Sequence, residues 1–131
     1  QIISGIREHF DKKDLLNTKL IVVTNLKPRP MKGVTSYGMI LAASNDDHSY
    51  LEIVRPPDDS IVGERITLEN MDVNEYKPDN EIKPNKKNSP WAKIKNLLKT
   101  NDNMEACFDG NRFMTSKGPL TVKSLKNAQL S

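Results

Sequence analysis

The sequence has 131 residues, of which 28% are charged and 36% apolar, a composition that suits one folded domain and excludes wholesale disorder. No apolar run approaches the ~20 residues that cross a membrane, and the first residues lack a signal-peptide pattern, so the sequence supports neither a membrane span nor secretion. The net charge of +3 is strongly segregated: cations and anions number seven and three in residues 1–45, three and eleven in 46–81, and ten and three in 82–131.

Charge and cysteine usage suggest a partner and a compartment. The asymmetry predicts a nucleic-acid face and an acidic side that repels polyanions, although charges scattered over a solvated surface remain an alternative. The single cysteine, Cys107, can form no internal disulfide, which favours the reducing cytoplasm.

The first part of the chain predicts short strands around one helical turn. Asp11 is expected to cap a turn that ends at Leu16, with Asp14 three residues after the cap. The apolar run Leu20–Val23 predicts a buried strand. Further strands are expected at Tyr37–Ala43, at Tyr50–Val54 after a turn at 44–47, and, half exposed, at Glu64–Glu69.

The second part predicts a long connection, one helix and a hairpin. Residues 70–88 are polar, proline-dotted and without periodicity. Ser89 and Pro90 then predict an N-cap and the first position of a helix that ends near Thr100. Its apolar face is expected to hold Trp91, Ile94, Leu97 and Leu98. Asp109-Gly110 predicts a hairpin between Met104–Phe108 and Arg112–Thr115, and Leu120–Leu125 a last strand. Short strands with one inserted helix indicate a mainly β fold with a small barrel.

Residues that could carry catalysis are isolated from one another. His9 and His48 are the only histidines, and neither has a cysteine or histidine at metal-ligand spacing. Cys107 lies in a strand-like segment, where a buried apolar role is commoner than a nucleophilic one. The six glycines are scattered and form no phosphate cradle. We therefore expect no catalytic residue, no metal site and no cofactor.

Clustered cations favour the binding of a polyanion. Lys27, Arg29 and Lys32 share a proline-restricted loop after the buried strand, which reduces the entropy lost when phosphate is held. A second cluster, six lysines without an acid, comprises Lys83, Lys86, Lys87, Lys93, Lys95 and Lys99, and could equally be a solvated helix and linker. Few aromatic residues are available for base stacking, Tyr37 and Tyr50 being the only plausible platforms. The pattern indicates recognition of folded RNA by shape and phosphates.

Motifs spread along the chain resemble a known family. They are Ser4-Gly5, Asn25-Leu26-Lys27-Pro28, Met31-Lys32-Gly33, Ser36, Gly38-Met39, Ala42-Ala43-Ser44, Pro56-Pro57, Gly63-Glu64-Arg65, Lys83-Pro84, Trp91 and Phe113-Met114-Thr115. This pattern resembles the tRNA-binding domain shared by endothelial monocyte-activating polypeptide II and the domains appended to several aminoacyl-tRNA synthetases.

The resemblance implies an oligonucleotide-binding (OB) barrel over residues 1–70 and a C-terminal extension over 71–131 that packs on it, making a monomeric module. It implies a noncatalytic, largely sequence-nonspecific tRNA-binding function in the cytoplasm, assisting a methionyl-, tyrosyl- or lysyl-tRNA synthetase in cis or in trans. A cytokine-like extracellular polypeptide and a synthetase-complex scaffold are the alternatives. The implied tRNA-binding residues are Lys27, Arg29, Lys32, Ser36, Met39, Lys83, Lys86, Lys87 and Lys93.

The start of the family pattern has no counterpart in the sequence. Relatives have a strand, a loop and a second strand before the segment that matches residues 2–5, so we expect the first hairpin of the barrel to be absent. An open barrel leaves unpaired strand edges. The chain alone is therefore expected to be poorly stable unless further N-terminal residues or a swapped partner complete the barrel.

Overall fold

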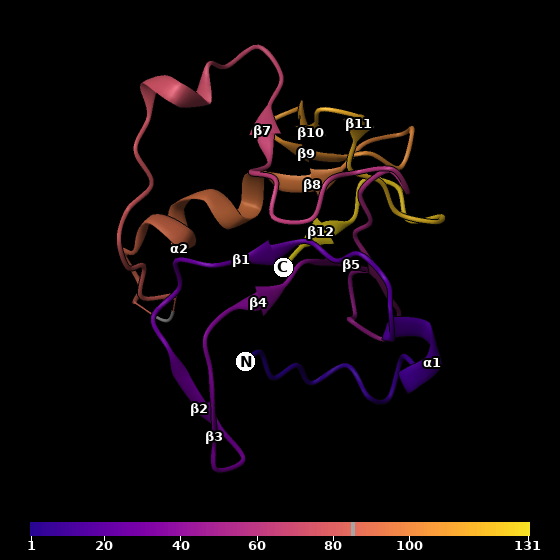
Figure 1. Ribbon diagram of the computed structural model, residues 1–131, viewed down its shortest axis with the longest axis vertical. Coiled ribbons are helices and arrows are strands. Elements are labelled where there is room, and N and C mark those ends of the chain that lie inside the picture. Colours follow the sequence, from indigo (N-terminus) through magenta and orange to yellow (C-terminus); the bar gives the residue numbers. More distant parts are fainter. Residues whose placement is uncertain (85) are drawn as a thin grey trace.

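The computed structural model describes residues 1–84 and 86–131 and is mainly β, as the sequence predicts (Figure 1). Two short α-helices are present in the described residues, α1 (Lys12–Leu15) and α2 (Pro90–Ile94), with 3-10 turns η1 (Val73–Glu75) and η2 (Lys95–Leu97). The strands are β1 (Val22–Val23), β2 (Arg29–Met31), β3 (Val34–Ser36), β4 (Met39–Ile40), β5 (Ala42–Ser44), β6 (Leu51–Ile53), β7 (Thr67–Leu68), β8 (Leu98–Thr100), β9 (Ala106–Phe108), β10 (Asn111–Thr115), β11 (Gly118–Pro119) and β12 (Gln129–Leu130).

One curled antiparallel sheet crosses both parts of the chain. Its order is β11-β10-β9-β8-β12-β5-β6, and β7 pairs with β10. The junction is β12, where Gln129 lies opposite both Ser44 of β5 and Lys99 of β8. The pairs β1-β4 and β2-β3 form two smaller sheets. The C-terminal strand β12 is thus hydrogen bonded to strand β5 of the N-terminal part. The division of the chain into a barrel and an extension at residue 70 stays a prediction.

The core lies inside the curl of this sheet. Its buried members come from both parts of the chain and are Ile21, Leu41, Ala43, Val54, Leu98, Ala106, Leu120, Val122, Ala128 and Leu130. Trp91 and Ile94 of α2 pack against this cluster while half-buried, as expected for residues on the predicted apolar face of the helix. No helix in the described residues is long and apolar enough to cross a membrane.

Several predicted elements are confirmed where local signals are strong. Asp11 precedes α1, and its backbone N–H donates to the Asp14 carboxylate at 3.0 Å. The predicted hairpin forms between β9 and β10, with Asp109 and Gly110 at φ values of 47° and 80°. Both residues of such a tight turn need positive φ, which an Asp-Gly pair tolerates. Strand β6 lies within the predicted segment Tyr50–Val54.

Other boundaries differ because tertiary pairing overrides the local pattern. The predicted helix to Thr100 is wrong beyond Ile94: the chain continues as η2 and then as β8, whose three residues pair with β9. Leu97, expected on the apolar face, is 41% exposed. The predicted strand Leu120–Leu125 is also wrong, since among the described residues Thr121 makes only isolated bridges to Arg55 and Glu105 there.

Three further strands are shorter than expected. Of the predicted buried strand Leu20–Val23, only Val22–Val23 forms β1, and both residues are half-buried. Tyr37–Ala43 divides at Leu41 into β4, which pairs with β1, and β5, which pairs with β6 and β12. The change of partner bends the chain into the curl. Of the half-exposed segment Glu64–Glu69, only Thr67–Leu68 forms a strand.

Candidate nucleic-acid interface

The first basic cluster is carried by a β-hairpin where a loop was expected. Arg29 lies opposite Ser36 and Met31 opposite Val34, and the turn consists of Lys32 and Gly33 at φ 49° and 80°. Glycine supplies one of these positive φ values without strain. The hairpin extends away from the main sheet (Figure 1). Lys27, Arg29 and Lys32 are all exposed, with Lys32 at the tip.

The N-terminal segment holds one side of this hairpin. The Gln1 side chain donates to the Thr35 carbonyl at 2.7 Å, and the Tyr37 N–H donates to the Gln1 carbonyl at 3.0 Å. Ser36 is buried, its Oγ accepting from the Ile3 N–H at 2.9 Å and lying 3.0 Å from the Gly38 carbonyl, to which it donates. The Ser36 hydroxyl therefore fixes the backbone, and its predicted contact with tRNA stays a prediction.

The long connection holds the other side and brings the two basic clusters together. The Lys27 N–H donates to the Ile82 carbonyl and the Ile82 N–H to the Asn25 carbonyl, both at 2.7 Å. The Asn25 side chain adds a bond to the Asp79 carbonyl at 3.0 Å. Residues 79–82 thus run beside the base of the hairpin and are held there by these hydrogen bonds. Lys83 follows directly.

Helix α2 follows the connection directly and adds further cations to the interface. The Ser89 Oγ accepts from the Ala92 N–H at 3.1 Å and Pro90 occupies the first turn, as predicted for this helix start. Its first turn holds no acidic residue. Lys93 and Lys95 are exposed on this helix and on η2.

A cavity of about 390 Å³ lies between the N-terminal segment, the hairpin, the connection and the helical segment of α2 and η2. Of the predicted site residues, Lys27, Arg29, Ser36 and Met39 line it. The remaining lining comes from residues outside the predicted set: Ile3, Ser4, Gly5, Leu26, Met31, Gly38, Pro84, Trp91 and Lys95. Lys32, Lys83, Lys86, Lys87 and Lys93 do not line it; all five are exposed.

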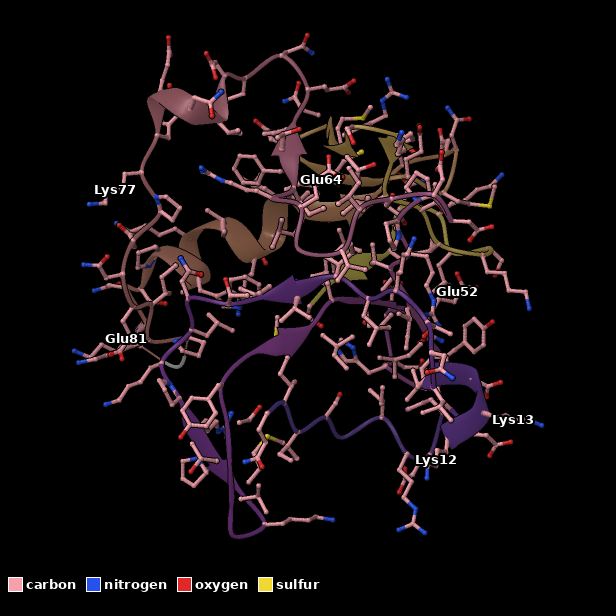
Figure 2. All side chains as sticks on the ribbon, in the orientation of Figure 1. Lys12, Lys13, Glu52, Glu64, Lys77 and Glu81 are labelled. Carbon is pink, nitrogen blue, oxygen red and sulfur yellow. The ribbon has the colours of Figure 1, made fainter. Side chains whose placement is uncertain are left out.

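The cations of this interface are available to a ligand. In the part of the chain that the structure describes, the ion pairs join Lys13 to Asp11 and Arg112 to Glu69 and Glu105, and none involves a cation of the hairpin, the connection or α2. Figure 2 shows Lys12 and Lys13 on α1, across the molecule from Lys77 and Glu81 on the connection. The α1 cations are therefore outside the interface.

Many carboxylates of the acidic middle segment serve the fold. Glu52 is 4% exposed; burial raises the pKa of its carboxyl, but hydrogen bonds from Ser124, Leu125 and Tyr50 outweigh this and lower it. The backbone N–H groups of Ser124 and Leu125 donate at 2.8 and 3.1 Å. Glu69 accepts from the Arg112 backbone and guanidinium at 2.9 and 3.0 Å, which lowers the pKa of Glu69.

The potentially reactive residues do not converge. The His48 Nδ1 lies 2.9 Å from the Ser44 Oγ in a turn, and His9 is half-buried beside Phe10. Cys107 is buried in β9, and burial raises the pKa of its thiol, so it stays protonated near neutral pH. The described residues contain no group of three or more His, Cys, Asp or Glu side chains that could hold a metal ion.

Sequence reasoning missed the cavity and part of its lining. Trp91 is predicted only as part of the apolar helix face, yet it contacts both the core and the cavity. Lys95 was placed in the second cluster but not in the site. Ser4 and Gly5 carry part of the family resemblance, which was the available signal. Their side of the cavity could not be located without the hydrogen bonds of the N-terminal segment to the hairpin.

Comparison with known proteins identifies the family. Residues 1–65 match the family model described as "Putative tRNA binding domain". A "Probable methionine–tRNA ligase" of Oryza sativa subsp. japonica is 36% identical over 98% of this chain. The aminoacyl tRNA synthase complex-interacting multifunctional protein 1 of Cricetulus griseus is 33% identical over 97% of it. A crystal structure of the C-terminal domain of Plasmodium vivax p43 superposes with a TM-score of 0.89, at 35% identity over 99% of this chain and 76% of that one.

The chain spans only 16% of the rice ligase and 34% of the hamster protein, so it corresponds to one part of each. The mainly β fold and its curled sheet agree with an OB-type barrel, and the p43 domain shares this fold over nearly the whole chain. The chain therefore belongs to the family of tRNA-binding domains of the endothelial monocyte-activating polypeptide II type, which also supplies part of a methionine–tRNA ligase and of a synthetase-complex-interacting protein.

Proposed function

We propose that this chain is a noncatalytic tRNA-binding module that assists an aminoacyl-tRNA synthetase, either as a C-terminal appended domain or as an associated cofactor. One observation carries the proposal: the hairpin, the connection and α2 bring cations from distant parts of the sequence to one surface. These cations lack ion-pair partners within the described residues. A surface of this kind suits a phosphate backbone.

The module acts by capture. Contacts to phosphate and sugar position a nucleic acid without reading its sequence, so unrelated tRNAs are accepted alike. Tethering such a tRNA-binding module to a synthetase raises the local tRNA concentration at the enzyme. The synthetase then binds tRNA more readily, without any change in which tRNA it charges. The predicted tRNA contacts are those of Lys27, Arg29, Lys32, Ser36, Met39, Lys83, Lys86, Lys87 and Lys93. The Ser36 hydroxyl also holds the backbone of the hairpin.

The module works as a monomer in the cytoplasm in this proposal. Support for a monomer comes from β12, which joins β8 of the C-terminal part to β5 of the N-terminal part within the same chain. The buried, reduced Cys107 suits a reducing compartment. Light scattering after size-exclusion chromatography tests the oligomeric state directly.

Gel-shift titration with total tRNA at several salt concentrations tests the function. We expect micromolar or tighter binding that weakens as salt rises. The matched control is Lys12→Ala/Lys13→Ala, which removes two cations outside the interface and should bind as the unchanged chain does. Weak binding that ignores salt would refute the proposal and favour a protein scaffold or an extracellular signalling role.

A further inference from the structure

The cavity in the interface has the size and lining of a small-ligand site. Its volume of about 390 Å³ falls within the range of roughly 300–1,000 Å³ of small-molecule pockets. Leu26, Met31, Met39 and Trp91 give it an apolar lining. Trp91 supplies an indole ring, and methionine side chains adapt to the shape of a flat ligand.

Cations lie beside this apolar lining. Arg29 lines the cavity from strand β2 of the hairpin, and Lys27 lines it from the segment just before that strand. Lys95 lines it from η2. The hydrogen-bonding capacity of Ser36 is already taken by Ile3 and Gly38. The cavity therefore offers stacking and positive charge together, with few free polar groups. A nucleotide has both matching parts, an aromatic base and an anionic phosphate.

We propose that this cavity receives one unpaired nucleotide of the bound RNA, with its base against Trp91, Met31 and Met39 and its phosphate held by Lys27, Arg29 and Lys95. The inference rests on the proposed tRNA-binding function and names which part of the RNA enters the site. Bases inside a helix are stacked and paired and cannot enter, whereas bases in loops, bulges and ends can. The base is held by stacking, so its identity matters little.

The single tryptophan makes entry of a base directly observable. Trp91 is the only tryptophan in the chain, so the tryptophan fluorescence reports on the surroundings of this one residue, which lines the cavity and also packs against the core. The probes are total tRNA, a short unstructured oligoribonucleotide and a blunt RNA duplex of mixed sequence. We expect the tRNA and the oligonucleotide to quench Trp91, and the duplex to bind through phosphates without quenching.

Gly5 offers a way to fill the cavity without straining the backbone. It lines the cavity, and a Cβ added there meets no atom within 4 Å. Gly5→Phe should place an aromatic ring in the part of the cavity that the base is proposed to occupy. Gly5→Ala is the matched control, because it leaves most of the cavity open. Since stacking of a base on an aromatic side chain contributes substantially to single-strand binding, we expect Gly5→Phe to weaken oligonucleotide binding about tenfold, and duplex binding to stay within twofold. Circular dichroism checks that both variants fold.

The outcomes separate this inference from the proposed function. Salt-sensitive tRNA binding with no quenching of Trp91 by the oligonucleotide would overturn the inference alone, whether or not Gly5→Phe folds. The same holds if a folded Gly5→Phe chain binds the oligonucleotide as tightly as Gly5→Ala does. A chain that binds no RNA of any kind would overturn the proposed function and the inference with it.

Discussion

Replacing Lys27, Arg29 and Lys32 by alanine tests which basic cluster holds the phosphates. Lys27 and Arg29 line the cavity, and Lys32 lies in the turn at the tip of the hairpin. None of the three has an ion-pair partner among the described residues, so their removal leaves no carboxylate unpaired. The hairpin strands are held by backbone pairing and by the buried Ser36. The triple substitution should therefore change charge while leaving the fold intact.

The expected effect is a change in salt dependence. Each phosphate contact contributes roughly 0.7–0.9 to the slope of log affinity against log salt, so three lost contacts lower the slope by about 2 to 3. Raising salt from 50 to 200 mM lowers the affinity of both chains for tRNA. By the same relation, the factor by which affinity falls should be about 20 to 40 times smaller for the variant than for the unchanged chain.

The assay is fluorescence anisotropy with labelled total tRNA at four or more salt concentrations. Lys12→Ala/Lys13→Ala is the control for a general loss of net charge, and its slope should equal that of the unchanged chain. Equal slopes for the unchanged chain and the Lys27, Arg29, Lys32 variant, with circular dichroism unchanged, would show that the hairpin does not hold phosphate.

The second cluster gives a smaller expected effect. Lys83, Lys86 and Lys87 are exposed and do not line the cavity, so each must order a long side chain against solvent to reach phosphate. We expect their replacement by alanine to lower the slope by about one contact, or roughly 0.7–0.9. A larger drop than that of the hairpin variant would move the main contact surface to the connection.

Four further outcomes are expected. Unrelated tRNAs should bind within about one decade, or ~1.4 kcal/mol, of each other in parallel titrations, and a single tRNA bound a hundredfold better would contradict phosphate-based recognition. Glu81→Gln should strengthen tRNA binding a few-fold at low salt, because it removes an exposed anion beside the hairpin base; unchanged affinity would place the RNA elsewhere. Glu52→Gln should lower the free energy of unfolding by about 1.5–3 kcal/mol at pH 7 in urea titrations. Since folding lowers the pKa of Glu52, its contribution is complete above the unfolded value of about 4.3 and is lost as pH falls toward the folded value, so the two chains should converge in acid. The chain alone should be poorly stable, because a cavity of about 200 Å³ lies between half-buried Val22 and Val23 of β1 and core residues such as Leu98 of β8; cooperative unfolding at high temperature would contradict this.

Local patterns predicted the elements whose geometry is set within a few residues. Asp109-Gly110 specified its hairpin because tight turns need positive φ at both positions, and Ser89-Pro90 specified a helix start because the cap and first turn satisfy local donors. The end of that helix could not be predicted in the same way. Leu98 to Thr100 join β8 because β9 and β12 supply strand partners, and those partners are distant in sequence.

The sequence predicted which residues belong to the site but not how they are arranged in space. Charge, prolines and the family resemblance pointed to Lys27, Arg29 and Met39, which the structure brings to one cavity. The pairing of Asn25 and Lys27 with Ile82 is invisible to periodicity, because a single parallel bridge imposes no pattern on either segment. Without that contact, the two basic clusters could be predicted only as separate surfaces.

The same contact revises the electrostatic picture drawn from the sequence. The acidic segment 46–81 was expected to form a repelling side away from the nucleic acid. Its end, however, runs beside the hairpin, so Asp79 and Glu81 belong to the cationic interface. Earlier carboxylates of the segment, such as Glu52 and Glu69, are occupied by hydrogen bonds within the fold. At physiological salt the Debye length is about 8 Å, so anions at the interface act on bound RNA far more strongly than those across the molecule. We therefore expect the orientation of bound tRNA to depend mainly on the few charges around the cavity, and less on a distant acidic side than the segment sums of the sequence suggest.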